Sequence, residues 1–150
     1  MMNKHSVFFL NLKQLYRGLH STHPTFLLTR LIEQYKHQDR LIIAYDFDDT
    51  VKPYWCASCE DVKSVLRLCK DVLNAYFIVY TCNSDHNAIE AYLKEEEIPF
   101  DVINQNAPFI DKNSFDGKLF YNVLLDDKAG LGEVVKTLEE LCYLIGNKII

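Results

Sequence analysis

Residues 41–52 read Leu-Ile-Ile-Ala-Tyr-Asp-Phe-Asp-Asp-Thr-Val-Lys, and this stretch decides the fold. Its apolar first half is typical of a strand buried on both faces in the middle of a parallel sheet. The apolar run stops at three carboxylates, Asp46, Asp48 and Asp49, which Thr50 follows. Acids directly after such a strand lie outside the core, in the crevice where open α/β sheets bind ligands. The stretch therefore predicts a central strand that ends in a ligand site.

Asp46 and Asp48 are two residues apart, so in extended backbone their side chains point the same way. Two carboxylates aimed at one spot repel each other unless a proton or a cation lies between them. We therefore expect a cation site or an acid/base pair. Asp49 should face away from its neighbours, which favours a cap or surface role.

After residue 41 the chain alternates between strand and helix patterns, which predicts βαβ units and a parallel sheet. Strands are predicted at Leu41–Asp46, Tyr76–Tyr80, Asp101–Ile103 and Tyr121–Leu125, and helices at about Glu60–Asn74, Asp85–Glu97 and Leu131–Ile145. Ser84 is placed as the N-cap of the second of these helices, and Pro99 is its stop signal. The pattern therefore indicates an α/β fold.

Residues 1–40 differ from the rest and predict a helical extension in front of a core at 41–150. A first helix is indicated by apolar residues at helical spacing: Phe9, Leu12, Leu15, Tyr16 and Leu19. Pro24 suits the first turn of a second helix. The apolar face of that helix would be Phe26, Leu27, Leu28, Leu31, Ile32 and Tyr35.

The bulk composition limits the partners. At 150 residues the chain is one domain by length, and a net charge of −5 gives no strong nucleic-acid signal. Its five cysteines are an odd number, which suits a reducing cytoplasm better than a disulfide framework. No segment approaches membrane-spanning length and no signal peptide is recognised, so we expect a cytoplasmic protein without a membrane partner.

Two further polar segments follow predicted strands and should meet the first one at the same edge of the sheet. One is Thr81-Cys82-Asn83-Ser84, where a hydroxyl and backbone N–H groups open a helix, which favours anion binding. The other is Asp126-Asp127-Lys128. Lys118 precedes the last strand. Carboxylates without His or Cys favour Mg²⁺, and a cation, a lysine and a helix N-terminus together would clamp a phosphate.

These segments resemble the four motifs of the haloacid dehalogenase-like superfamily. Asp46-Phe47-Asp48-Asp49-Thr50 is similar to the first motif, Asp-x-Asp-x-Thr after a hydrophobic strand. Thr81 resembles the second, Lys118 the third, and Asp126-Asp127 the fourth. The resemblance covers residues 41 to about 145, and all four motifs in order at strand ends are specific. Leu119 follows Lys118 where short members often have proline, so Lys112 remains a rival for the third motif.

The resemblance implies a Mg²⁺-dependent phosphatase that works through an aspartyl-phosphate. Asp46 would be the nucleophile and Asp48 the general acid/base. Mg²⁺ would be held by Asp46, the backbone carbonyl of Asp48 and Asp126, with Asp127 orienting a water on the ion. The phosphate would be bound by the segment Thr81, Cys82, Asn83 and by Lys118. The implied fold is a three-layer Rossmann-like parallel sheet flanked by helices.

Only about ten residues separate Thr50 from the next predicted helix, too few for the cap domain that family members commonly insert. A capless site would accept a bulky or macromolecular phosphorylated substrate. The N-terminal helices could pack beside the site or form a homodimer. Tyr54 and Trp55 lie in the short loop after the first motif and could stack on an aromatic substrate or pack as core or lid.

Three alternatives stay open. The first is a catalytically weak module of the same fold that binds phosphorylated protein or nucleic acid. The second is an interaction protein driven by residues 1–40, which truncation before Leu41 would test. The third concerns Cys56-Ala57-Ser58-Cys59, whose spacing permits a zinc or redox pair but more often reflects structural packing.

Overall fold

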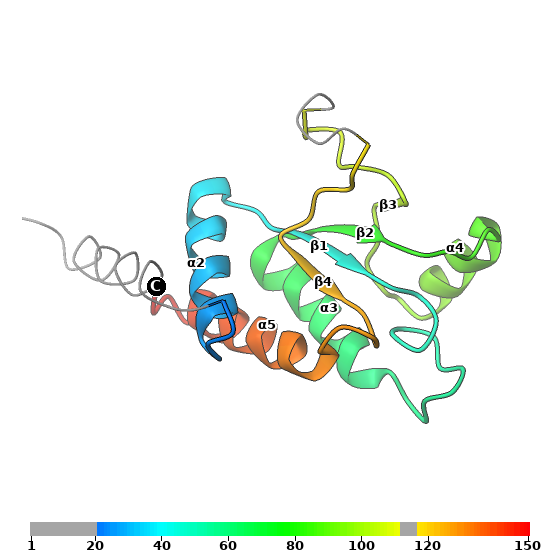
Figure 1. Cartoon of the computed structure of the whole chain (residues 1–150), viewed down its shortest axis with the longest axis horizontal. Coiled ribbons are helices and arrows are strands. Elements are labelled where there is room, and N and C mark those ends of the chain that lie inside the picture. The colour runs from blue at the N-terminus through cyan, green and yellow to red at the C-terminus, as the bar shows by residue number, and fades with distance from the viewer. Residues whose placement is uncertain (1–20, 112–116) are drawn as a thin grey trace, which may run out of the picture.

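A computed structural model describes residues 21–111 and 117–150, so the first predicted helix and Lys112 lie outside the described residues. The described elements appear in Figure 1 in the order α2 (Phe26–Gln38), β1 (Ile42–Tyr45), α3 (Glu60–Leu73), β2 (Tyr76–Val79), α4 (His86–Glu95), β3 (Val102–Ile103), β4 (Val123–Leu125) and α5 (Leu131–Gly146). Each strand and helix predicted after residue 41 is present, with bounds that differ by one or two residues. The predicted α/β fold is confirmed.

The described strands form one parallel sheet in the order β3-β2-β1-β4. Tyr45 at the end of β1 pairs with Val79 on one side and with Leu125 on the other. The three strands therefore end at the same level. Because the chain returns from β3 across the sheet to place β4 beyond β1, the crossovers change direction beside β1, where open sheets of this kind bind ligands.

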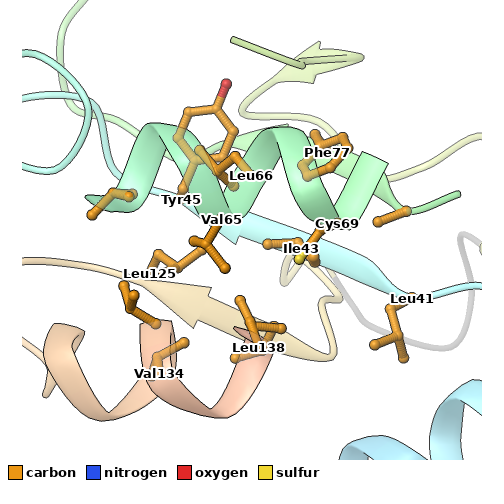
Figure 2. Close-up of a cluster of buried hydrophobic side chains, with 14 of the residues drawn as sticks. Leu41, Ile43, Tyr45, Val65, Leu66, Cys69, Phe77, Leu125, Val134 and Leu138 are labelled. Atoms are coloured by element: carbon orange, nitrogen blue, oxygen red, sulfur yellow. The ribbon is translucent and has the colours of Figure 1, made fainter. Parts of the chain in front are cut away.

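One face of the sheet is covered by α3 and α5, which pack against each other (Figure 1). Figure 2 shows Ile43 and Tyr45 of β1 in one cluster with Leu66 from α3 and Leu138 from α5. The buried Tyr45 hydroxyl donates to the carbonyl of Pro99 at 2.9 Å, so its polar end is satisfied. This layer fixes the strand ends that carry the acids.

The other face is covered by irregular chain. Ile42, Ala44 and Ile78 pack there against Ala107 and the segment 119–121. Among the described residues, no helix lies in this cluster. The coarser prediction of a parallel sheet flanked by helices is confirmed, and it is compatible with a Rossmann-like fold. The third helical layer stays a prediction.

Helix α2 belongs to the main core. Leu31 and Ile32 are buried in the same cluster as β1, and α2 packs against α5. Arg30 donates to the carbonyl of Asn122 at 2.9 Å, and the Asn122 side chain accepts from the Ile42 N–H at 2.7 Å. Truncation before Leu41 would therefore remove core side chains. The division of the chain at residue 40 stays a prediction.

Two local predictions were wrong by one or two residues. Helix α2 begins at Phe26 with Thr25 as its N-cap, so Pro24 precedes the helix instead of lying in its first turn. Helix α4 is capped by Asp85, whose side chain accepts from the Ala88 N–H at 3.1 Å, and Ser84 lies one residue outside. A carboxylate beside a helix N-terminus is favoured by the helix dipole, which explains the preference for Asp85. Within residues 21–111 and 117–150, no helix is long and apolar enough to cross a membrane.

Candidate active site at the carboxyl edge of the sheet

Asp46 and Asp126 lie side by side because of the strand register. They directly follow the paired residues Tyr45 and Leu125, and the Asp46 N–H donates to the Leu125 carbonyl at 2.9 Å. The pairing of two central strands thus sets the separation of two acids that are 80 positions apart in the chain. Asp127 follows at once, and its N–H donates to the hydroxyl of the buried Thr50 at 3.2 Å. Thr50 therefore joins the loop after β1 to the loop after β4.

These contacts gather three carboxylates. One oxygen each of Asp46, Asp126 and Asp127 lies within 4.8 Å of the others. Burial raises the pKa of Asp46, and the charges of Asp126 and Asp127 raise that pKa further, while the Phe47 N–H and Lys128 lower it. Because the pKa of Asp46 is raised despite Lys128, the positive charge nearby does not fully balance the three acids. The arrangement would be relieved by a cation.

Asp48 lies on the same side as Asp46, with the buried Phe47 between them. Both acids line one pocket. The turn that carries Asp48 is closed by two bonds to the Phe47 carbonyl, from the Val51 and Lys52 N–H groups at 3.1 and 3.0 Å. Asp48 is exposed, and its side chain is outside the group of three clustered carboxylates. Its predicted contact with a metal is through the backbone carbonyl, which stays a prediction.

Asp49 organises the loop instead of joining the acid cluster. Its backbone has a left-handed φ of 58°, and one carboxylate oxygen accepts the N–H groups of Tyr54, Trp55 and Cys56, the first at 2.8 Å and the last at 3.0 Å. These hydrogen bonds lower the pKa of Asp49, and the bond from the Cys56 N–H has the largest effect. Asp49 therefore holds the loop together and caps no helix, since the N-cap of α3 is Cys59. The loop holds Tyr54 and Trp55 at the pocket with side chains that are 73% and 86% exposed.

The segment after β2 forms the second wall. The Thr81 hydroxyl accepts from the Asn83 N–H at 3.1 Å, so its own hydrogen can turn toward the pocket. Asn104 clamps the Thr81 backbone, because its side-chain oxygen accepts from the Thr81 N–H at 2.9 Å and its amide donates to the Thr81 carbonyl at 2.7 Å. We did not predict this role for Asn104. The sequence signal was an asparagine directly after β3, a residue type that tolerates left-handed backbone, and its φ in the structure is 52°.

The two walls enclose a pocket of about 460 Å³. It is lined by Asp46, Asp48, Asp49, Tyr54, Trp55, Thr81, Cys82, Asn83, Asp127 and Lys128. Lys118 is exposed, accepts from the Asn106 side chain through its carbonyl at 3.2 Å, and is not among these residues. Lys128 does line the pocket, and it lies close enough to Asp46 to lower the pKa of that carboxyl group. The cation beside these acids in the described part of the chain is thus Lys128, which sequence reasoning noted only as a neighbour of the acids.

The donor set fits a hard divalent cation. The clustered ligand atoms are all carboxylate oxygens, without nitrogen or sulfur. Such oxygens suit Mg²⁺, which is bound through a few carboxylates and keeps several waters. Asp46 and Asp126 are half-buried, and Asp127 is exposed, so an ion there would remain open to water and ligand.

Comparisons of this chain with protein-family models, with curated proteins and with solved structures gave no match.

Proposed function

We propose that this protein is a Mg²⁺-dependent phosphatase that hydrolyses phosphomonoesters through an aspartyl-phosphate on Asp46. The observation that carries the proposal is the clustering of Asp46, Asp126 and Asp127, of which Asp46 and Asp127 line one pocket together with the Thr81 segment. Clustered acids alone would repel a phosphate. A cation among the acids and hydrogen-bond donors on the facing wall would together attract one.

Asp46 would act as the nucleophile. Its carboxylate would attack phosphorus in line, so that an Asp46 O–P bond forms while the ester P–O bond breaks. Asp48 lines the same pocket and would donate its proton to the leaving oxygen. In the second half, Asp48 would take a proton from the attacking water, and phosphate would leave with Asp46 regenerated.

The remaining residues would hold the phosphate and the ion. The Thr81 hydroxyl and the segment with Cys82 and Asn83 face the acids and would donate to the equatorial oxygens. Lys128 would supply positive charge beside Asp46. Mg²⁺, held by Asp46 and Asp126 with Asp127 nearby, would neutralise phosphate charge when bound. Positioning and charge stabilisation of this kind supply most of the rate in phosphoryl transfer.

One observation favours the alternative of a weakly catalytic phosphate-binding module. Lys118, the proposed third-motif lysine, does not line the pocket, and its rival Lys112 lies outside the described residues. If Lys128 does not replace that function, the transition-state charge would be less well balanced. The protein would then bind phosphate and turn over slowly.

Hydrolysis of a simple aryl phosphate separates these cases. Wild-type protein should release the phenol with Mg²⁺, stop in excess chelator, and recover when Mg²⁺ is restored. Asp46→Asn should abolish turnover while the far-ultraviolet circular dichroism stays unchanged. Turnover that persists in chelator or in Asp46→Asn would contradict the mechanism. Saturable binding of inorganic phosphate without turnover would instead support the binding module.

A further inference from the structure

The loop between β1 and α3 holds two thiols that the proposed chemistry does not use. The Sγ atoms of Cys56 and Cys59 are 3.2 Å apart, and both cysteines are free. A disulfide requires a separation of about 2.05 Å. The two sulfurs therefore need to approach by roughly 1 Å, within one four-residue segment.

A metal does not account for this pair. Structural zinc takes four ligands. Among residues 21–111 and 117–150, the only group of three or more potential ligand side chains is the acid cluster, which contains neither cysteine. Packing and redox chemistry remain, and the 3.2 Å between the two sulfurs together with the access to Cys56 favours redox chemistry.

We infer that Cys56 and Cys59 are a site of reversible oxidation to an intramolecular disulfide, and that this disulfide changes the mouth of the pocket. The oxidant is a low-molecular-weight disulfide. The thiolate of Cys56 attacks one sulfur of that oxidant, whose S–S bond breaks and releases one thiol. The sulfur of Cys59 then attacks Cys56 Sγ and displaces the second thiol. Two cysteines lose two electrons and two protons, and one oxidant disulfide becomes two thiols.

The order of attack follows from exposure. Cys56 is half-buried, whereas only 4% of Cys59 is exposed, so Cys56 is the sulfur that a small disulfide can reach. Burial raises the pKa of the Cys59 thiol to about 12, and the hydrogen bond and charge of Cys56 contribute to that rise. Once Cys56 is in a mixed disulfide, it carries no thiolate charge and these contributions fall. Lys63, which lowers the pKa of Cys59, stays in place.

The position of the pair connects the disulfide to the pocket. The Cys56 N–H is one of the three that Asp49 holds, and the preceding residue is Trp55, which lines the pocket. Cys59 is the N-cap residue of α3, and its carbonyl accepts from the Lys63 N–H at 3.1 Å. Closing the disulfide would draw the Cys56 sulfur toward Cys59 at the start of α3, beside the N–H that Asp49 holds. The effect on turnover, but not the disulfide itself, rests on the proposed phosphatase function.

The other three cysteines act as internal comparisons. Cys69 and Cys142 also form a thiol pair, with sulfurs 3.7 Å apart, but both are buried between α3 and α5, where an oxidant has no access. Cys82 is exposed and lines the pocket from the opposite wall. It can form a mixed disulfide with the oxidant. Of the five cysteines, only Cys56 and Cys59 combine a sulfur that the oxidant can reach with a second sulfur close to it.

The test equilibrates the folded full-length protein with mixtures of reduced and oxidised glutathione, then blocks free thiols with an alkylating agent. Intact mass and peptide mapping should find a loss of two hydrogens and a Cys56–Cys59 linkage, reversed by dithiothreitol. Cys82→Ser, the matched control, should keep this behaviour, and Cys56→Ser and Cys59→Ser should each lose it. Failure to form the linkage at any glutathione ratio, or its formation only in denaturant, would overturn the inference.

Trp55 gives a second readout that does not depend on activity, because it is the only tryptophan in the chain. Its fluorescence should change on oxidation of wild-type protein and Cys82→Ser, and stay constant in the double variant Cys56→Ser/Cys82→Ser. Oxidation should also lower aryl phosphate turnover at least twofold more in wild-type protein than in Cys56→Ser, because the oxidant can modify Cys82 in both. A disulfide with unchanged fluorescence and turnover would overturn the effect on the pocket. A disulfide in a protein without phosphatase activity when reduced would contradict the proposed function and leave the oxidation site standing.

Discussion

Tyr45 and Asp46 are neighbours in the chain, but Tyr45 belongs to the buried core and Asp46 to the charged carboxyl edge of the sheet. Tyr45 is fully buried, and its hydroxyl is satisfied by the Pro99 carbonyl. Asp46 is half-buried, and its pKa is raised by burial and by nearby acids. The core behind the sheet gains stability from every contact, whereas the carboxyl edge gathers charges that oppose folding. The difference teaches that the edge relies on the core to hold its acids together, so substitutions in the two regions should have opposite consequences.

After the complete loss expected for Asp46→Asn, the largest effect on turnover should come from Asp48→Asn at the edge. Loss of a general acid/base lowers turnover by about 10²–10⁴-fold. Since the second half-reaction needs Asp48 as base, phosphate should accumulate on Asp46 during turnover of an aryl phosphate. Acid quenching and intact mass would detect it. Asp71→Asn, a control at an exposed acid of α3, should retain wild-type turnover. Equal turnover in Asp48→Asn and Asp71→Asn would remove Asp48 from the mechanism.

A core substitution should give the reverse result. Leu138 on α5 is completely buried and faces the sheet beside Val134 (Figure 2). Leu138→Ala should lower the free energy of unfolding by about 2–5 kcal/mol, because it removes packed methyl groups and leaves a cavity. Urea denaturation would measure this loss. Turnover per folded molecule should stay within about twofold of wild type.

Tyr143→Ala on the same helix is the matched control, since that side chain is 61% exposed. Its unfolding free energy should change by no more than about 0.5 kcal/mol. If Leu138→Ala stops turnover in molecules that remain folded, the separation between core and edge is wrong.

The parts that the sequence predicted are those with strong local patterns. The apolar run of β1 and the acids after it set the central strand, and the acids after β4 meet them because paired parallel strands end together. The clamp by Asn104 was not predicted, because it depends on how the loop after β3 approaches Thr81. The same holds for Lys128, which only the turn after β4 brings beside Asp46. The residues that cover the other face of the sheet, Ala107, Ile110 and 119–121, have no periodicity that a sequence pattern could reveal.

Asn104 provides a test where the edge and its support meet. Asn104→Gly removes the two bonds to Thr81 while allowing the left-handed backbone. Stability should fall by about 1–3 kcal/mol, and inorganic phosphate should inhibit aryl phosphate hydrolysis about tenfold more weakly because Thr81 is misplaced. Inhibition constants and urea denaturation would measure both effects.

Asn106→Ala is the control for that substitution. Asn106 makes the same kind of paired bonds, from the Phe120 N–H at 2.7 Å and to the Lys118 carbonyl at 3.2 Å, without touching Thr81. The Asn106→Ala variant should lose a similar amount of stability, and inorganic phosphate should inhibit it as strongly as it inhibits the wild type. Weakened phosphate inhibition in both variants would mean that Asn104 acts through general stability and does not position Thr81.

The smallest effect should be a gain of stability at the edge. The pKa of Asp46 is raised above its ordinary value of 3.8, so the folded state holds that proton more tightly than the unfolded state. Below pH 3.8 the carboxyl is protonated in both states and costs nothing. As pH rises through the folded pKa, the ionised form opposes folding. Without metal at neutral pH, Asp46→Asn should therefore melt slightly higher than wild type, by less than the change in Leu138→Ala.

Two conditions should abolish or reverse that difference. Lowering the pH below 3.8 should bring the two melting temperatures together. Adding Mg²⁺ at neutral pH should raise the melting temperature of the wild type more than that of Asp46→Asn, because a ligand that binds the folded state stabilises it. Thermal melts at several pH values, with and without Mg²⁺, would measure both. A metal-free variant less stable than wild type at neutral pH would mean that Asp46 belongs with Tyr45 in the stabilising core, and the contrast between the two neighbours would fail.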